Sequence, residues 1–224
     1  MAKKMVALIV GSGPGLSASL ARRAAAEGMS VALAARNTDK LGNLCTEIGA
    51  KAYPCDATHG DQVDALFDAV TQDFGIPNLV IYNPSGRVRG PIVDLDRDAV
   101  LNAIMVSAYG GFLVGQKAAQ GMLTLGGGTI LFTGATASVK AVAKSASFAM
   151  GKFALRGLAQ SMARELQPQN IHIGHFIIDG GIGKSDDGSK LDPDAIAETY
   201  FAVHHQDRSA WTWEMELRPF VEVF

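Results

Sequence analysis

Near the start of the chain stands the sequence Met5-Val6-Ala7-Leu8-Ile9-Val10-Gly11-Ser12-Gly13-Pro14-Gly15-Leu16-Ser17. Its first six residues form a short apolar run typical of a buried strand, and the alanine-rich segment that follows has the composition of a helix. Glycines between a strand and a helix let the backbone turn tightly and approach a pyrophosphate, which the first amides of the helix bind. This order predicts a dinucleotide-binding loop. The alternative is an ordinary loop, because Leu16 stands where the Gly-x-Gly-x-x-Gly pattern has its third glycine.

The alternation of strand and helix continues along the chain. Short apolar or β-branched runs predict strands at residues 5–10, 30–35, 52–54, 79–82, 129–133 and 171–178, with a last strand at 213–217. Longer helical patterns occupy residues 16–27, 38–48, 61–74, 97–123, 148–166 and 194–204. We therefore expect one α/β domain over residues 1–224, with a doubly wound, Rossmann-like parallel sheet and helices on both faces. Ligands should bind beyond the carboxyl ends of the strands.

Composition narrows the class of partner. The 224 residues suffice for a single domain that buries roughly 70% of its unfolded surface. Charged residues make up 19%, the formal net charge is −2 and no run of like charges occurs, so no nucleic-acid or membrane partner is expected. Cys45 and Cys55 alone form neither a disulfide framework nor a metal site, which favours a reduced, cytoplasmic protein without a metal.

No targeting or membrane-spanning segment is predicted. Lys3 and Lys4 precede an apolar run of about six residues, which is shorter than the roughly 7–15 residues of a signal peptide and is better explained by the first strand. No stretch was expected to reach the ~20 apolar residues of a membrane span. A small-molecule ligand is therefore the expected partner.

Four motifs resemble those of the short-chain dehydrogenase/reductase family. Val10-Gly11-x-x-x-Gly15-Leu16-Ser17 resembles its Thr-Gly-x-x-x-Gly-Ile-Gly loop, departing at the first and last positions. The other three motifs are Cys55-Asp56-Ala57-Thr58 for the family's Asp-Val segment, Tyr82-Asn83-Pro84-Ser85 for Asn-Asn-Ala-Gly, and Asp179-Gly180-Gly181-Ile182 for Pro-Gly-x-Val. In the family, the acid of the Asp-Val segment accepts a hydrogen bond from the adenine amine. The backbone of the aliphatic residue in Pro-Gly-x-Val contacts the carboxamide of the nicotinamide. The resemblance implies cofactor contacts at Gly11, Ser12, Gly13, Gly15, Leu16, Asp56, Ala57, Asn83, Lys152 and Ile182.

Arg36 indicates which dinucleotide is preferred. An NAD-binding member ends its second strand with an acid that bonds the ribose hydroxyls and repels a phosphate, whereas this chain has Ala35 followed by Arg36. A charge-assisted bond from a guanidinium to a phosphate contributes about 1.5–3 kcal/mol. We therefore expect NADP(H) rather than NAD(H). The alternative is a solvated surface arginine without a ligand.

The resemblance also locates a divergent active site. Family members use a tyrosine, a lysine, a serine and an asparagine; alignment on Lys152 places Phe148 at the tyrosine, Ala135 at the serine and Ser107 at the asparagine. Loss of the general acid and the carbonyl donor should slow carbonyl reduction, because each typically contributes about 10²-fold or more. Hydroxyls at Thr136, Ser138, Ser145 and Ser147 are possible substitutes, although capping or turn roles are the favoured explanation for each. Tyr82 and Tyr109 are further candidate acids, expected to pack with wet hydroxyls.

Two functions remain open. The first is an NADP(H)-dependent oxidoreductase that transfers a hydride to or from a small carbonyl, alcohol or activated double bond. The second is a non-catalytic NADP(H)-binding sensor or assembly module, since ribose binding alone explains Lys152. We also expect a homodimer or homotetramer formed through the helices at 97–123 and 148–166, whose small residues include Ala103, Ala108, Ala154 and Ala159.

Overall fold

Seven parallel strands form the centre of the protein in the computed structural model, which describes residues 5–222. The strand order is β3-β2-β1-β4-β5-β6-β9, and every neighbouring pair is parallel. The strands span Val6–Val10 (β1), Ser30–Ala35 (β2), Lys51–Pro54 (β3), Leu79–Tyr82 (β4), Gly128–Thr133 (β5), Ile171–Ile178 (β6) and Glu214–Leu217 (β9). The winding reverses between β1 and β4, and open α/β sheets bind ligands beside such a reversal.

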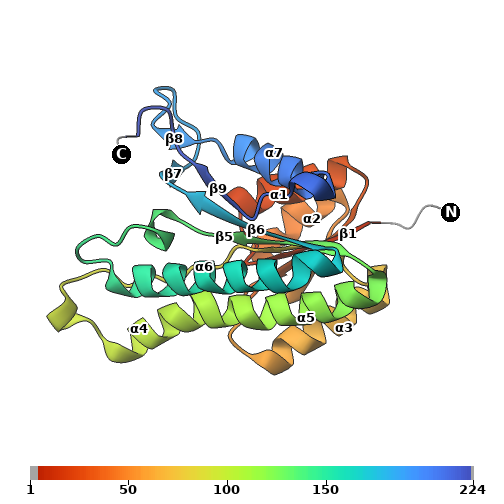
Figure 1. The fold of residues 1–224 in the computed structure, drawn as a ribbon, viewed down its shortest axis with the longest axis horizontal. Helices are drawn as coiled ribbons and strands as arrows, with labels where there is room; N and C mark the ends of the chain where they lie inside the picture. Colours follow the sequence, from red (N-terminus) through yellow and green to blue (C-terminus); the bar gives the residue numbers. More distant parts are fainter. Residues whose placement is uncertain (1–4, 223–224) are drawn as a thin grey trace.

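Helices cover both faces of this sheet (Figure 1). On one face lie α1 (Leu16–Ala26), α2 (Gly42–Ile48) and α7 (Pro193–His204). On the other face lie α3 (Gly60–Phe74), α4 (Arg97–Ile104), α5 (Gly110–Leu125) and α6 (Ala146–Leu166). The predicted doubly wound α/β fold is confirmed.

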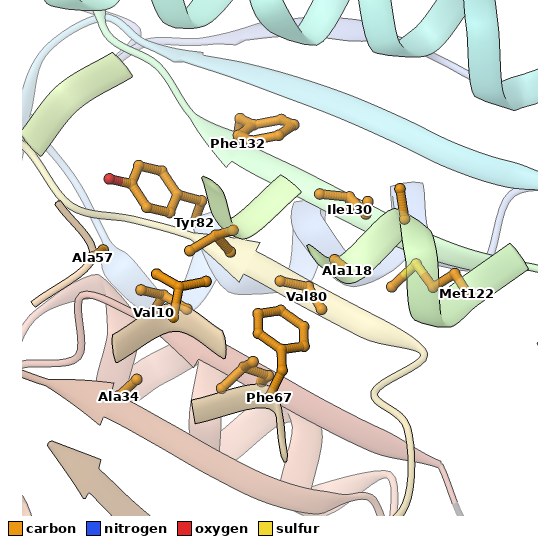
Figure 2. Close-up of a cluster of buried hydrophobic side chains, with 14 of the residues drawn as sticks. Val10, Ala34, Ala57, Phe67, Val80, Tyr82, Ala118, Met122, Ile130 and Phe132 are labelled. Atoms are coloured by element: carbon orange, nitrogen blue, oxygen red, sulfur yellow. The ribbon is translucent and has the colours of Figure 1, made fainter. Parts of the chain in front are cut away.

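Each face of the sheet buries its own apolar cluster. Val6, Leu8 and Val10 of β1 join the cluster under α3, α5 and α6, whereas Ala7 and Ile9 join the cluster under α1, α2 and α7. Figure 2 shows the first cluster, in which side chains from the strands interlock with those of the helices. Strands buried on both faces have continuous apolar sequences, and burying one large apolar side chain contributes about 1.5–3 kcal/mol.

The predicted helix at 97–123 is interrupted by a π-helical segment, Met105–Tyr109, between α4 and α5. A tertiary contact that the sequence pattern does not contain lies at this segment. The Tyr82 hydroxyl at the end of β4 donates to the Val106 carbonyl, and a Cβ on Gly110 would lie 2.4 Å from that hydroxyl. Ser107 in the same segment bonds Gly86 in the loop after β4, near the carboxyl end of the sheet.

Other boundaries match the expectation or differ from it by one or two residues, and a second predicted helix is subdivided. The predicted helix at 38–48 begins as a 3₁₀ turn at Asp39–Leu41 and continues as α2. A second, two-stranded sheet of β7 (Gly181–Ile182) and β8 (Lys190–Leu191) was not predicted. The interpretation of residues 1–4 lies outside the described residues.

The helical run from α4 through α5, Arg97–Leu125, corrects one expectation. Its 29 residues include an 18-residue window with a mean hydropathy of 1.4, which suffices for a membrane span by length and composition alone. This hydropathy was not evident in the sequence analysis, because the run mixes alanine and glycine with its larger apolar residues and shows no continuous stretch of large ones. The run packs against α3, α6 and the sheet, and 33% of its apolar window is buried in the subunit.

Candidate active site

A cavity of about 310 Å³ lies at the carboxyl ends of β1, β2 and β4, beside the reversal of winding. We call it the switch-point cavity. Six of the predicted cofactor residues line it: Gly11, Ser12, Arg36, Asp56, Ala57 and Asn83. Asn37 and Lys40, which the sequence analysis did not single out, also line it. Gly13, Gly15, Leu16, Lys152 and Ile182 are not among its lining residues.

The glycine loop has the geometry that a pyrophosphate requires. Gly11 has a φ of +82°, and a Cβ there would lie 2.7 Å from Pro84, so the position admits only glycine. Gly13 and Gly15 face open space, which allows close approach to their backbone. Gly15 caps α1 without any side-chain hydrogen bond, so no capping side chain occupies the amides of the first turn. The loop residues therefore fit a dinucleotide phosphate.

Two predicted contacts have structural roles in this loop. The Asn83 amide donates to Ser17 Oγ at 2.7 Å, and Ser17 Oγ donates to the Gly11 carbonyl at 3.0 Å. This chain of bonds ties the end of β4 to the glycine loop. Leu16 is 4% exposed and packs in the core under α1, so its side chain is not available to a ligand.

The wall formed by β2 and β3 carries the charges of the switch-point cavity. Arg36 and Lys40 are exposed, and neither forms an ion pair with a described residue. Asp56 Oδ1 accepts hydrogen bonds from the Thr58 amide and hydroxyl. Burial opposes ionisation of Asp56, but the Thr58 donors, His59 and Arg36 together hold its pKa below the ordinary value. The cavity thus offers two cations and one ionised acid.

A second and larger cavity, of about 630 Å³, lies at the carboxyl ends of β5 and β6 and at the start of α6. We call it the α6 cavity. Two of the four residues aligned with family catalytic positions, Ala135 and Phe148, line it. The other two, Ser107 and Lys152, are buried behind it and line neither cavity. Ile182 on β7 is 42% exposed and follows Gly181, which does line the α6 cavity.

Lys152 points at backbone carbonyls. Its Nζ donates to the Thr133 carbonyl at 2.7 Å and approaches the Pro84 carbonyl at 3.5 Å. The side chain is 2% exposed, and burial lowers its pKa from 10.5 to about 8. The amine therefore links the ends of β5 and β4, between the two cavities.

Ser107 does not offer a free polar group to order water. Its Oγ accepts from the Gly86 amide at 2.9 Å and donates to the Gly86 carbonyl at 3.3 Å. The residue is fully buried within the π-helical segment. Ser107 therefore fastens the loop after β4 to the π-helical segment.

The four candidate hydroxyls divide into two groups. Thr136 and Ser145 line the α6 cavity; Thr136 donates to Asp179, and Ser145 accepts from Arg87 at 3.2 Å. Ser138 and Ser147 are fully buried and line neither cavity, consistent with structural roles. The expectation of a wet hydroxyl is wrong for Tyr82, since helix packing places the Val106 carbonyl against it, whereas Tyr109 is 43% exposed.

Sequence reasoning missed Tyr200 on α7. It is fully buried, its ring stacks on Phe176 with centroids 3.6 Å apart, and its hydroxyl lies 2.9 Å from Thr133 Oγ1. Burial raises its pKa above the ordinary value. Tyr200 and Lys152 thus meet the same Thr133 from opposite faces of the sheet, and Tyr200 lines neither cavity.

A buried polar chain lies behind Ala135. Ser138 Oγ accepts from the Ala135 amide at 3.1 Å and lies 3.4 Å from His175 Nε2, while His175 Nδ1 lies 3.0 Å from Glu214. Arg156 donates to Glu214 through both Nε and Nη2. Burial lowers the pKa of His175 to about 4. Because Ser138 and His175 are at most 1% exposed, this group supports the segment after β5 and does not act as a nucleophile.

Within residues 5–222, no group of three or more histidine, cysteine or acidic side chains could hold a metal ion.

Arg87, which the sequence analysis did not consider, lies over the Phe148 ring with its guanidinium 4.7 Å from the centroid and lines the α6 cavity. No periodic pattern or motif marks it, because its position depends on how two distant loops pack.

Comparisons with known proteins agree with this architecture. An uncharacterised oxidoreductase from Staphylococcus aureus (strain N315) is 26% identical over 223 residues, covering 96% of each chain. The (+)-borneol dehydrogenase 1 of Salvia officinalis is 31% identical over 195 residues, covering 83% of this chain and 74% of its own.

Solved structures extend the likeness to three dimensions. A short-chain dehydrogenase from Rhodopseudomonas palustris is 37% identical, covers 96% of this chain and 99% of its own, and superposes with a TM-score of 0.87. A metagenomic short-chain oxidoreductase in complex with NADP is 26% identical, with 97% and 98% coverage and a TM-score of 0.86. The family model for short chain dehydrogenase matches residues 5–186. Both cavities lie at the carboxyl ends of strands, as the fold predicts. On the match to the family model, this chain belongs to the short-chain dehydrogenase family.

Proposed function

We propose that this protein binds NADP(H) and acts as an oxidoreductase on a small carbonyl, alcohol or activated double bond, through an active site that lacks the usual tyrosine and serine. The observation that carries the proposal is the pair of cavities on either side of Lys152. The switch-point cavity suits the adenosine phosphates, and the α6 cavity suits a substrate. When bound, the cofactor supplies or accepts a hydride.

Arg36 and Lys40 support a preference for NADP(H). Both are cationic, both line the switch-point cavity at the end of β2, and neither is neutralised by a described ion pair. A phosphate on the adenosine ribose would be bonded there, whereas the two hydroxyls of NAD(H) would find no acid among the lining residues that follow β2, which are Arg36, Asn37 and Lys40. Two structural neighbours are complexes with NADP or 5-hydroxy-NADP, which fits this assignment.

The side chains at the α6 cavity are better suited to bind and orient a substrate than to transfer a proton to it. Ala135 and Phe148 have no hydroxyl, and Lys152 is held by the Thr133 carbonyl. Thr136 and Ser145 are the hydroxyls at the cavity wall, each already bonded to a charged group. A reaction that needs only hydride transfer, with the proton drawn from water, suits this set better than ordinary ketone reduction.

The second candidate function is a non-catalytic NADP(H)-binding module. It is favoured by the same absence of hydroxyls at residues 135 and 148. The two functions are distinguished by turnover, because both require the cofactor to bind.

The test of the proposal is a titration of wild type, Arg36→Ala and the control Arg164→Ala with NADPH and NADH, monitored by cofactor fluorescence. Arg164 lies near the end of α6 and lines neither cavity. We expect NADPH to bind about 10- to 100-fold more tightly than NADH, and Arg36→Ala to remove most of this difference. Equal affinities in wild type, or an unchanged preference in Arg36→Ala, would contradict the assignment.

We also propose a cytoplasmic homodimer or homotetramer that uses α4, α5 and α6. Two of the small residues expected at this interface, Ala103 and Ala159, are at most 2% exposed because they pack inside the subunit, so they do not form it. Larger apolar side chains are exposed on the same helices: Leu101, Tyr109, Phe112, Leu123, Met150 and Phe153. Such a surface supports association between copies.

A further inference from the structure

The loop after β4 is fastened on both sides of Arg87. Gly86 exchanges two hydrogen bonds with Ser107, and Val88 exchanges two with Ser147, whose Oγ accepts from the Val88 amide at 3.0 Å and donates to its carbonyl at 2.9 Å. Both serines are fully buried. A Cβ on Gly86 would lie 2.6 Å from Ala103, so the loop also packs closely on α4. The backbone at Arg87 is therefore held in one place.

The guanidinium of Arg87 is positioned as well. It lies 4.7 Å from the centroid of the Phe148 ring, and Nη2 donates to Ser145 Oγ at 3.2 Å. All three residues line the α6 cavity. Among residues 5–222 no carboxylate forms an ion pair with Arg87. Burial and the repulsion of Arg89 lower its pKa, but a guanidinium stays protonated in proteins.

The charged residues that line the α6 cavity differ in whether they are paired. Arg87 in the loop after β4 and Lys140 in the segment after β5 have no ion pair among the described residues. Asp179, Glu216, Arg218 and Glu222 also line the cavity. Arg218 bonds Asp179 at 2.7 Å and Glu216 at 2.6 Å. Two of the three carboxylates are thus partnered by Arg218, whereas no described carboxylate partners the two cations.

We propose that Arg87 and Lys140 form a subsite for an anionic group of the substrate, a carboxylate or a phosphate. A guanidinium presents a planar fork of donors that matches either group, and Lys140 adds a point charge. Val139 and Val142 line the same cavity and are 41% and 55% exposed, so they offer a contact to an apolar part of the substrate. This inference deepens the proposed function, on which it rests, by naming the substrate class: an amphipathic carbonyl or alcohol with one anionic end.

The test measures binding of three probes of similar size, benzoate, phenyl phosphate and neutral benzyl alcohol, by isothermal titration calorimetry at low salt. Wild type, Arg87→Gln, Lys140→Gln and Arg89→Gln are compared, both free and saturated with NADPH. Arg89→Gln is the matched control, because it removes the same charge from the same loop at a residue that does not line the cavity. Saturation with NADPH excludes binding of phenyl phosphate at Arg36.

We expect benzoate, phenyl phosphate or both to bind at least tenfold more tightly than benzyl alcohol. Arg87→Gln should weaken the binding of the anions about 10- to 100-fold and leave the binding of benzyl alcohol unchanged. Arg89→Gln should change the affinity for either kind of probe by less than about twofold. The tighter of the two anions identifies the group. Equal binding of benzyl alcohol and the anions, or equal losses in Arg87→Gln and Arg89→Gln, would overturn the inference.

Failure of this inference and failure of the proposed function give different results. If NADPH binds with the expected preference but no anion depends on Arg87, the subsite is wrong and the proposed function stands. If NADPH does not bind, the proposed function fails, and Arg87-dependent binding of benzoate to the free protein still supports the anion subsite.

Discussion

Restoring hydroxyls at residues 148 and 135 should increase carbonyl reduction. Phe148 lines the α6 cavity and lies one helical turn before Lys152 on α6, so their Cβ atoms are about 5–6 Å apart. Arg87 covers the face of the Phe148 ring, which leaves the edge that would carry a phenol hydroxyl clear of it. In Phe148→Tyr a phenol would therefore fit beside the lysine without displacing Arg87.

The size of the effect depends on the separation between the Lys152 charge and the phenol oxygen. At a separation of about 5 Å and an effective dielectric constant of about 20, the protonated amine would contribute roughly 3 kcal/mol and lower the phenol pKa by about two units toward working pH. A general acid contributes about 10²–10⁴-fold and a carbonyl donor at residue 135 about 10²–10³-fold. Because such groups act as a unit, the double variant Phe148→Tyr/Ala135→Ser should exceed either single variant.

The assay is NADPH oxidation against a panel of ketones, aldehydes and quinones. Phe153→Tyr is the matched control, since Phe153 lies on the same helix, is 43% exposed and lines neither cavity. We expect little wild-type turnover, no gain in the control, and loss of the double variant's gain when Lys152→Met is added. Robust wild-type turnover that Lys152→Met leaves untouched would refute the assignment of this site.

Three further outcomes are expected. Burial lowers the pKa of Lys152 from 10.5 to about 8, so the unfolded state binds more protons than the folded state between these pH values. In denaturant titrations the free energy of unfolding, relative to Lys152→Met, should therefore rise by about 3 kcal/mol from pH 8 to pH 10.5. A difference that stays constant with pH would contradict the burial of the Lys152 charge. Gly11→Ala should lower the melting temperature because of its φ of +82° and the contact with Pro84, whereas Gly13→Ala, in open space, should keep it and lose only NADPH affinity. Light scattering at micromolar protein should show a dimer or tetramer, and Phe153→Glu should shift it toward monomer; a monomeric wild type would refute the proposed interface.

Much of the candidate site could be predicted because it follows directly from single strand ends. Gly11, Arg36 and Asn83 each come immediately after a predicted strand, and all three line the switch-point cavity. Lys40 was not predicted, because it lies in a 3₁₀ turn where the sequence predicted one uninterrupted helix. Tyr200 escaped notice because nothing in the periodicity of α7 shows that its hydroxyl reaches Thr133 on β5.

The amino-acid sequence by itself determined the order of strands and helices, the parallel sheet and the position of the glycine loop. These depend on local preferences and on the spacing of apolar residues, which a single chain displays. Only the tertiary structure decided that Ser107 and Ser147 hold the loop around Arg87, that Arg87 covers Phe148, and that Lys152 bonds Thr133. Such contacts join residues far apart in the chain, so they depend on how finished elements pack and leave no periodic trace in the sequence.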